Sequence, residues 1–311
     1  MKDIIDFLTA DPLRVAGMVS TQWNITDNDN YWYYRGTNDI LLVAHVDTVR
    51  KKQFKPLKLT IKNGIIRAEN SILGADDRAG CYAINELHNK YGSQCSILLT
   101  NYEEIGGIGV KQFIDDFPAL LSDYRLFLEL DRMGIDEFVY YSHQIPKNLR
   151  KSLESFNFNE EFGCYSDVQD LTDHYNIAHA NLSIGYYGHH TSGEYLDILA
   201  LDNLLIPRIS EMIEYFESTG ETYIVEKSTN KLANYTSKYL KNMYTDKHWG
   251  DHCDDDDFDN PVNIDYDYLD KLDMLEELGQ ITRQQWEDLE KDHIQYGTVI
   301  KFKTNGAGIY G

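Results

Sequence analysis

Side chains that can bind metal ions follow four separate apolar segments of the sequence. In chain order they are His45 with Asp47, Glu103 with Glu104, Asp131, and His189 with His190. A further acidic pair, Asp76-Asp77, stands in a Gly-Ala-Asp-Asp-Arg turn ahead of a predicted helix. Imidazole and carboxylate are the ligands that suit Zn²⁺, and a catalytic zinc site keeps one coordination position open. These residues therefore indicate metal-dependent chemistry.

The number of these ligands favours a pair of metal ions over a single one. Two ions about 3.5–4 Å apart can hold both the attacking and the departing oxygen of a hydrolytic reaction. A bridging carboxylate can hold such a pair, and a further carboxylate off the metals is needed to accept a proton from water. The sequence offers two histidines, one bridging acid, two terminal acids and one spare Glu.

Alternating strands and helices are predicted to position these side chains. Short apolar runs bounded by turn residues are typical of strands covered on both faces. The predicted strands are 31–35, 40–44, 97–99, 126–130, 138–141 and 182–187, with a hairpin at 57–68. The predicted helices are 2–9, 78–91, 109–117, 146–155 and 200–217. This alternation favours an α/β fold with a mostly parallel central sheet and helices on both faces. Ligands of such sheets bind at the carboxyl ends of the strands.

The C-terminal third differs in character from the rest of the chain. We therefore expect a catalytic domain at 1–220 and an acidic, tyrosine-rich, mainly helical extension at 221–311. Residues 270–293 predict a helical hairpin within this extension, with a capping box at Thr282 and Gln285.

Composition argues against several classes of partner. The formal net charge of −22 would repel a polyanion, so we expect no nucleic acid partner. No apolar run approaches 18 residues, so no membrane span is expected. Four cysteines without C-x-x-C spacing, and an N-terminus unlike a signal peptide, favour a reduced, cytoplasmic protein.

Over residues 38–200 the sequence resembles the zinc peptidase clan that holds the M28, M42 and M20 families. Five motifs of this clan occur in their usual order, and the resemblance implies a three-layer, zinc exopeptidase-like fold. Only 58 residues separate Asp131 from His190, which leaves no room for the lid domain of M20 enzymes. Only 30 residues separate His45 from Asp76, so the M42 insertion is also absent. A compact, M28-like domain is expected.

The resemblance also implies a role for each motif residue. The implied metal ligands are His45, Asp76, Glu104, Asp131 and His190, with Asp76 bridging the two ions. The implied catalytic residues are Glu103, as general base, and Asp47, which orients His45. Two alternatives stay open. Asp77 could replace Asp76, although the spacing to Gly80 favours Asp76, and His189 could replace His190, although the spacing from His190 to Glu194 fits the family.

The implied activity is that of an exopeptidase with two divalent ions, Zn²⁺ foremost and Co²⁺ or Mn²⁺ as alternatives. It would hydrolyse the N-terminal peptide bond of short peptides, with Glu103 taking a proton from the attacking water and returning it to the leaving amine. Two rival hypotheses remain: a metallo-amidohydrolase acting on N-acyl substrates, and an inactive relative that binds a partner. In each of the two enzyme hypotheses the substrate is a small peptide or amide.

Overall fold

The computed structural model describes residues 2–20, 22–27, 29–49, 57–141, 144–163 and 165–225. All of these residues fall within one compact unit. None of the helices in these ranges is long and apolar enough to cross a membrane. The extension expected at 221–311, with its hairpin at 270–293, lies outside the described residues except for its first five positions. The boundary at residue 220 therefore stays a prediction.

The described ranges contain an eight-stranded sheet with the order β1-β2-β6-β3-β7-β10-β8-β9. Its strands are β1 (Ile25–Asp27), β2 (Tyr31–Tyr34), β3 (Ile40–His45), β6 (Ser96–Thr100), β7 (Leu126–Arg132), β8 (Glu137–Val139), β9 (Asn159–Glu161) and β10 (Ala178–Ser183). The four central strands β6, β3, β7 and β10 run parallel to one another. The antiparallel pairs lie toward the edges of the sheet, so the expected mostly parallel centre is confirmed.

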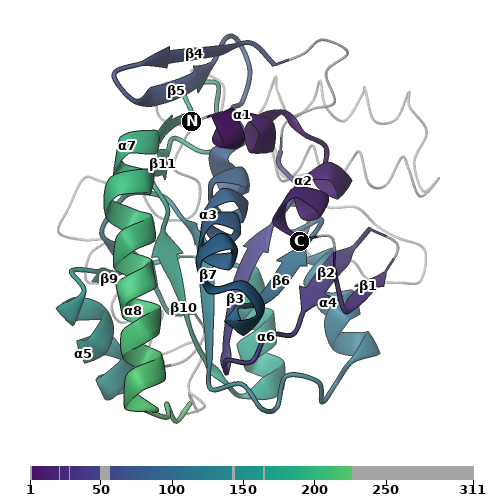
Figure 1. Ribbon diagram of the computed structural model, residues 1–311, viewed down its shortest axis with the longest axis vertical. Coiled ribbons are helices and arrows are strands. Elements are labelled where there is room, and N and C mark those ends of the chain that lie inside the picture. The colour runs from purple at the N-terminus through teal and green to yellow at the C-terminus, as the bar shows by residue number, and fades with distance from the viewer. Residues whose placement is uncertain are drawn as a thin grey trace, which may run out of the picture. The chain divides into compact units, whose positions relative to one another are not determined.

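Helices cover both faces of this sheet, as Figure 1 shows. On one face lie α1 (Lys2–Thr9), α2 (Pro12–Val19), α3 (Ala75–Tyr91) and α8 (Ile206–Thr219). On the other face lie α4 (Ile108–Asp116) and α6 (Asp167–Tyr175). Helix α5 (Lys147–Ser155) packs near β9, and α7 (Ile198–Ala200) leads through a short π-helical turn at Leu201–Leu205 into α8. The expected three-layer α/β sandwich is confirmed.

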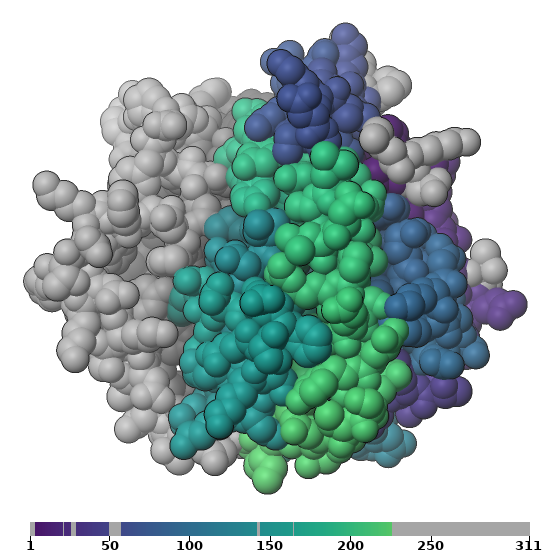
Figure 2. Space-filling view, turned by 60° about the vertical axis from the view of Figure 1, so that its left-hand side comes forward, coloured from purple at the N-terminus to yellow at the C-terminus, as the bar shows by residue number. Residues whose placement is uncertain are grey.

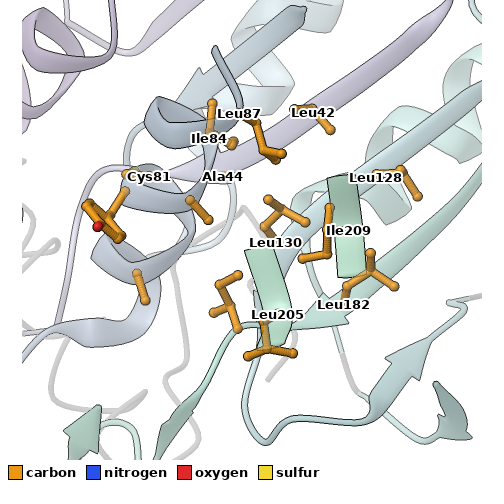
Figure 3. Close-up of a cluster of buried hydrophobic side chains, with 14 of the residues drawn as sticks. Leu42, Ala44, Cys81, Ile84, Leu87, Leu128, Leu130, Leu182, Leu205 and Ile209 are labelled. Carbon is orange, nitrogen blue, oxygen red and sulfur yellow. The ribbon is translucent and has the colours of Figure 1, made fainter. Parts of the chain in front are cut away.

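The apolar runs are continuous because both faces of the central strands are buried. Side chains of a strand point alternately to its two faces. In β3, Leu42 and Ala44 pack into the cluster under α3 and α8, whereas Leu41 and Val43 join the cluster under α4 and α6. Figure 3 shows the first cluster, in which residues of α3 and α8 meet those of β3, β7 and β10.

A second, smaller sheet in the described part of the chain has the order β11-β12-β5-β4. Its strands are β4 (Leu59–Lys62), β5 (Ile65–Ala68), β11 (Tyr186–Tyr187) and β12 (Tyr195–Asp197). The predicted hairpin at 57–68 is confirmed, and its turn residues Asn63 and Gly64 have the positive φ angles that a tight hairpin requires. In the space-filling view this hairpin, in blue, lies above the first residues of the green α7–α8 segment (Figure 2).

The strand predicted at 182–187 is wrong in its bounds. The segment forms β10 from Ala178 and then the separate strand β11. The sequence pattern does not predict the start of β10, because His179 and Asn181 interrupt the apolar run, although both are buried. The ring nitrogens of His179 are satisfied by the backbone N–H of Tyr141 and the hydroxyl of Thr172, which makes this burial tolerable.

Helices α2 and α6 are absent from the prediction. The signal for α2 was present, because Asp11 caps its first turn by accepting from the backbone N–H of Arg14, and Pro12 stands at its first position. For α6, Ser166 stands at the cap position, but its side chain makes no capping bond.

Gly80 tests how closely α3 packs on the sheet, and Gly17 of α2 serves as its control. A Cβ at Gly80 would overlap the carbonyl oxygen of Leu130 and the carboxylate of Asp77, whereas a Cβ at Gly17 would meet nothing. We expect Gly80→Ala to lower the free energy of unfolding by about 1–3 kcal/mol, because the helix must move away from β7. The matched control Gly17→Ala should raise it by roughly 0.5–1 kcal/mol. Urea unfolding measures both, and equal effects would contradict the close approach of α3.

Candidate metal centre

Strand register brings two of the predicted ligands together. Val43 of β3 pairs with Glu129 of β7 in parallel register. Two residues further on, His45 and Asp131 therefore lie side by side on the same face of the sheet. The Nε2 atom of His45 lies 3.6 Å from Oδ1 of Asp131. The carboxyl edge of the sheet thus assembles these groups as the sequence predicted.

Asp76 lies between two histidines. Its Oδ1 atom is 3.1 Å from Nε2 of His45, and its Oδ2 atom is 3.4 Å from Nε2 of His190. The two imidazoles come from distant parts of the chain, since His45 ends β3 and His190 follows β11. A carboxylate whose oxygens face different imidazoles has the shape of a bridging ligand.

Each histidine also faces a carboxylate of its own. His45 has Asp131 beside it, and Nε2 of His190 lies 3.0 Å from Oε2 of Glu104. The structure therefore brings together all five residues predicted as ligands, in two groups that share Asp76. Three donors of this kind can hold one Zn²⁺ and leave a position free for water or substrate.

Asp77 is turned away from the histidine rings. It is fully buried, and its two oxygens accept hydrogen bonds from the backbone N–H groups of His45 and Gly80, at 3.3 and 2.9 Å. Burial, together with the nearby Asp131, raises the pKa of Asp77 well above its usual range. The geometry favours Asp76 over Asp77 as the shared acid.

His189 stays a candidate ligand. Its ring lies against that of His190, and the two histidines form with Asp76 a group whose donor atoms lie within 4.8 Å of one another. Burial lowers the pKa of His189 to about 4, so the ring is neutral, as a ligand must be. Its Nδ1 atom has no hydrogen-bond partner in the described ranges. His189 can thus accompany His190 as well as replace it.

Asp47 holds two parts of the centre in place. Its Oδ1 atom lies 3.3 Å from Nδ1 of His45, on the side of the ring opposite Asp76. Its carboxylate also accepts hydrogen bonds from the backbone N–H groups of Glu103 and Glu104, at 3.2 Å each. The sequence predicted only the contact with His45. Asp47 therefore also fixes the segment that carries the acid pair.

The carboxylates of the centre create a strong preference for positive charge. Burial opposes protonation of His45, but Asp131, Asp47 and Asp76 outweigh it and raise the pKa of His45 well above its usual value. His190 shows the same balance, with Glu104 and Asp76 raising its pKa. Burial and the charge of Asp76 raise the pKa of Asp131 to about 7.

The same donor set fits bound cations. Oε1 of Glu104 is buried and has no hydrogen-bond partner in the described part of the chain, so it is free to accept a metal ion. Burying several carboxylates together is costly unless cations compensate them. Divalent ions between these groups would supply that compensation.

Glu103 is partly buried at the same edge of the sheet. Burial raises its pKa well above the usual range; His45 opposes this shift, and Glu104 adds to it. Its neighbour Glu104 faces His190, and both residues are held through their backbone N–H groups by Asp47. The structure therefore places Glu103 next to the ligand group.

Two supporting features were not predicted. The side-chain amide of Asn181 brackets Asp131, accepting from its backbone N–H at 3.0 Å and donating to its carbonyl oxygen at 3.3 Å. Ser166, at the start of α6, donates its hydroxyl to the buried carboxylate of Glu129. These bonds connect residues far apart in sequence, so no local pattern could indicate them.

Comparisons with known proteins bear on the fold. No family model and no curated protein matches this sequence. Among solved structures, aminopeptidase PepT from Bacillus cereus is similar with a TM-score of 0.51 and 15% identity, over 68% of this chain and 96% of that one. A tripeptidase from Staphylococcus aureus is similar with a TM-score of 0.52 and 14% identity, again over 68% and 96%. At such identities the likeness concerns the fold alone: the described part of the chain has the fold of these two peptidases, which agrees with the exopeptidase-like fold that the sequence resemblance implied.

Proposed function

We propose that this protein is an exopeptidase that uses two divalent metal ions to release the N-terminal residue of short peptides. The observation that carries the proposal is the position of Asp76 between His45 and His190, each of which has a second carboxylate beside it. The structural likeness to an aminopeptidase and a tripeptidase supports the same reaction class.

The proposed ligands divide into two groups. His45, Asp131 and Asp76 would hold the first ion, while His190, Glu104 and Asp76 would hold the second. Nitrogen and oxygen donors of this kind suit Zn²⁺. When bound, the ions supply Lewis-acid polarisation of the scissile carbonyl and activation of water.

The residues of the chain carry out the proton transfers. Glu103 accepts a proton from the attacking water and delivers it to the leaving amine, which is the usual work of a general acid–base carboxylate. The carboxylate of Asp47 lies 3.3 Å from Nδ1 of His45, where it can orient the ring with Nε2 toward the proposed metal position. The acidic centre also attracts the positively charged terminus of a peptide.

The role of Glu103 can be tested by removing its charge alone. Glu103→Gln should lower kcat by roughly 10²–10⁴-fold, because the amide cannot accept the proton. Its metal content should stay close to that of the wild type, since Glu103 is not a proposed ligand. The assays are steady-state kinetics on aminoacyl amides and elemental analysis. The control Glu69→Gln removes an exposed carboxylate and should change neither quantity; wild-type turnover in Glu103→Gln would refute the assignment.

The bridging role of Asp76 predicts a change in stoichiometry. Asp76→Ala should remove both metal ions, because the residue contributes to both groups. Asp131→Ala should remove mainly the ion beside His45 and leave the other bound. Elemental analysis after dialysis against a defined metal buffer measures both. If Asp76→Ala kept the metal content of the wild type, the shared carboxylate would have to be another residue.

The type of substrate can be tested with a panel of aminoacyl amides, short peptides and N-acyl amino acids. The proposal predicts turnover of the substrates with a free amino terminus and its loss when that amine is acetylated. Hydrolysis confined to the acylated amines would reject the peptidase assignment. A wild-type protein that neither binds metal nor hydrolyses any of these compounds would reject the enzymatic assignment altogether.

A further inference from the structure

Glu194 is a buried carboxylate outside the proposed ligand set. It lies between β11 and β12, four residues after His190, and only 1% of its surface is exposed. Its oxygens accept three backbone hydrogen bonds, from Gly74 at 2.7 Å, Ala75 at 2.7 Å and Asp76 at 3.1 Å. In the sequence, Glu194 matters only because its spacing from His190 fits the family pattern. The structure shows a direct connection to the segment that carries Asp76.

This connection satisfies backbone N–H groups at the non-helical start of α3. The first backbone N–H groups of a helix have no partner within the helix, and a capping side chain usually accepts from one of them. The cap position of α3 is occupied by Gly74, which has a left-handed backbone and no side chain to offer. A carboxylate 120 residues away in the sequence supplies the acceptor for this segment, whereas the helical turns that follow are capped by Asp77, whose carboxylate accepts from the backbone N–H of Gly80.

The bond matters for Asp76 because the helix itself does not fix this residue. Asp76 has non-helical backbone angles, φ −75° and ψ 107°, at the start of α3. Its N–H bond to Glu194 is therefore a main restraint on where its carboxylate can lie. A shift of this backbone would change the distances to both His45 and His190.

Glu194 also fixes the loop that carries His190. Its backbone N–H donates to the carbonyl oxygen of Thr191, and the hydroxyl of Thr191 donates to the carbonyl oxygen of Gly188. A second anchor lies at the outer side of this loop, where Arg67 donates to the carbonyl oxygen of Gly193 at 2.9 Å. Glu194, by contrast, connects the loop to the backbone of Asp76.

We propose that Glu194 is a positioning residue that sets the separation of Asp76 and His190, and with it the affinity of the metal position between them. The inference rests on the proposed function, because it concerns the metal ions of that site. It goes further because it predicts that the two metal positions depend on Glu194 to different degrees. Glu194 restrains two ligands of the position beside His190, Asp76 and His190, but only Asp76 of the position beside His45.

The chemistry of the contact requires a carboxylate. Three N–H donors converge on two oxygens, and an ionised carboxylate only accepts hydrogen bonds. In Glu194→Gln one oxygen becomes an NH₂ group that faces a backbone N–H, which leaves buried donors without an acceptor. Glu194→Asp keeps the charge but shortens the reach by one methylene, so it should restore part of the contact.

The test is a stepwise Co²⁺ titration of metal-free protein, followed by calorimetry and visible absorption. Glu104→Gln and Asp131→Asn assign each binding step to one position. We expect Glu194→Gln to weaken the step beside His190 by roughly 10–100-fold, the usual effect of residues that orient ligands. The step beside His45 should weaken less, and Glu194→Asp should lie between the wild type and Glu194→Gln.

Arg67→Ala is the matched control, because it releases the same loop without touching Asp76. It should leave both Co²⁺ affinities within a few-fold of the wild type. Circular dichroism and thermal melting establish that each variant is folded. A folded Glu194→Gln with both wild-type affinities, even at a lowered Tm, would overturn the inference, as would an equal loss in Arg67→Ala. Absence of Co²⁺ binding by the wild type would instead overturn the proposed function itself.

Discussion

Mutual repulsion among buried carboxylates is the constraint that the rest of this centre must satisfy. Asp76, Asp131 and Glu104 approach the same two imidazoles, and each loses much of its hydration by doing so. The raised pKa values of His45 and His190 express the need for positive charge at these places. A charge arrangement of this kind is unfavourable for folding alone and becomes favourable when cations occupy it.

The fold meets this constraint by fixing the acidic residues with neutral groups. The backbone of Asp131 is bracketed by the side-chain amide of Asn181, and the carboxylate of Asp77 accepts from backbone N–H groups. Asp47 accepts from the backbone of Glu103 and Glu104. Because these donors belong to adjacent strands and their loops, the parallel sheet both gathers the acids and restrains them. The core beneath, formed by the apolar faces of β3 and β7 under α3, supplies the rigidity.

The sequence predicts those residues of the centre that lie directly at the ends of apolar strands. His45 and Asp131 follow apolar runs in adjacent parallel strands, so period-two geometry alone brings them together. The distinction between Asp76 and Asp77 rested on a spacing, and the structure explains it, since Asp77 is occupied by backbone donors. Glu194 and Asn181 could not be assigned roles in this way, because their partners are backbone groups far away in the chain. The start of β10 was missed because its polar residues point into a buried network.

The small sheet connects the surface hairpin at residues 59–68 to the loop that carries His190 and Glu194. Hairpins of this kind are ordinarily places where chain length varies freely during evolution. Here the inner strand β5 pairs with β12, residue Ile66 opposite Leu196, directly after the loop that carries His190 and Glu194. A length change in β5 would therefore shift the register of β12 and the loop before it, whereas a change in the outer strand β4 would leave that register in place.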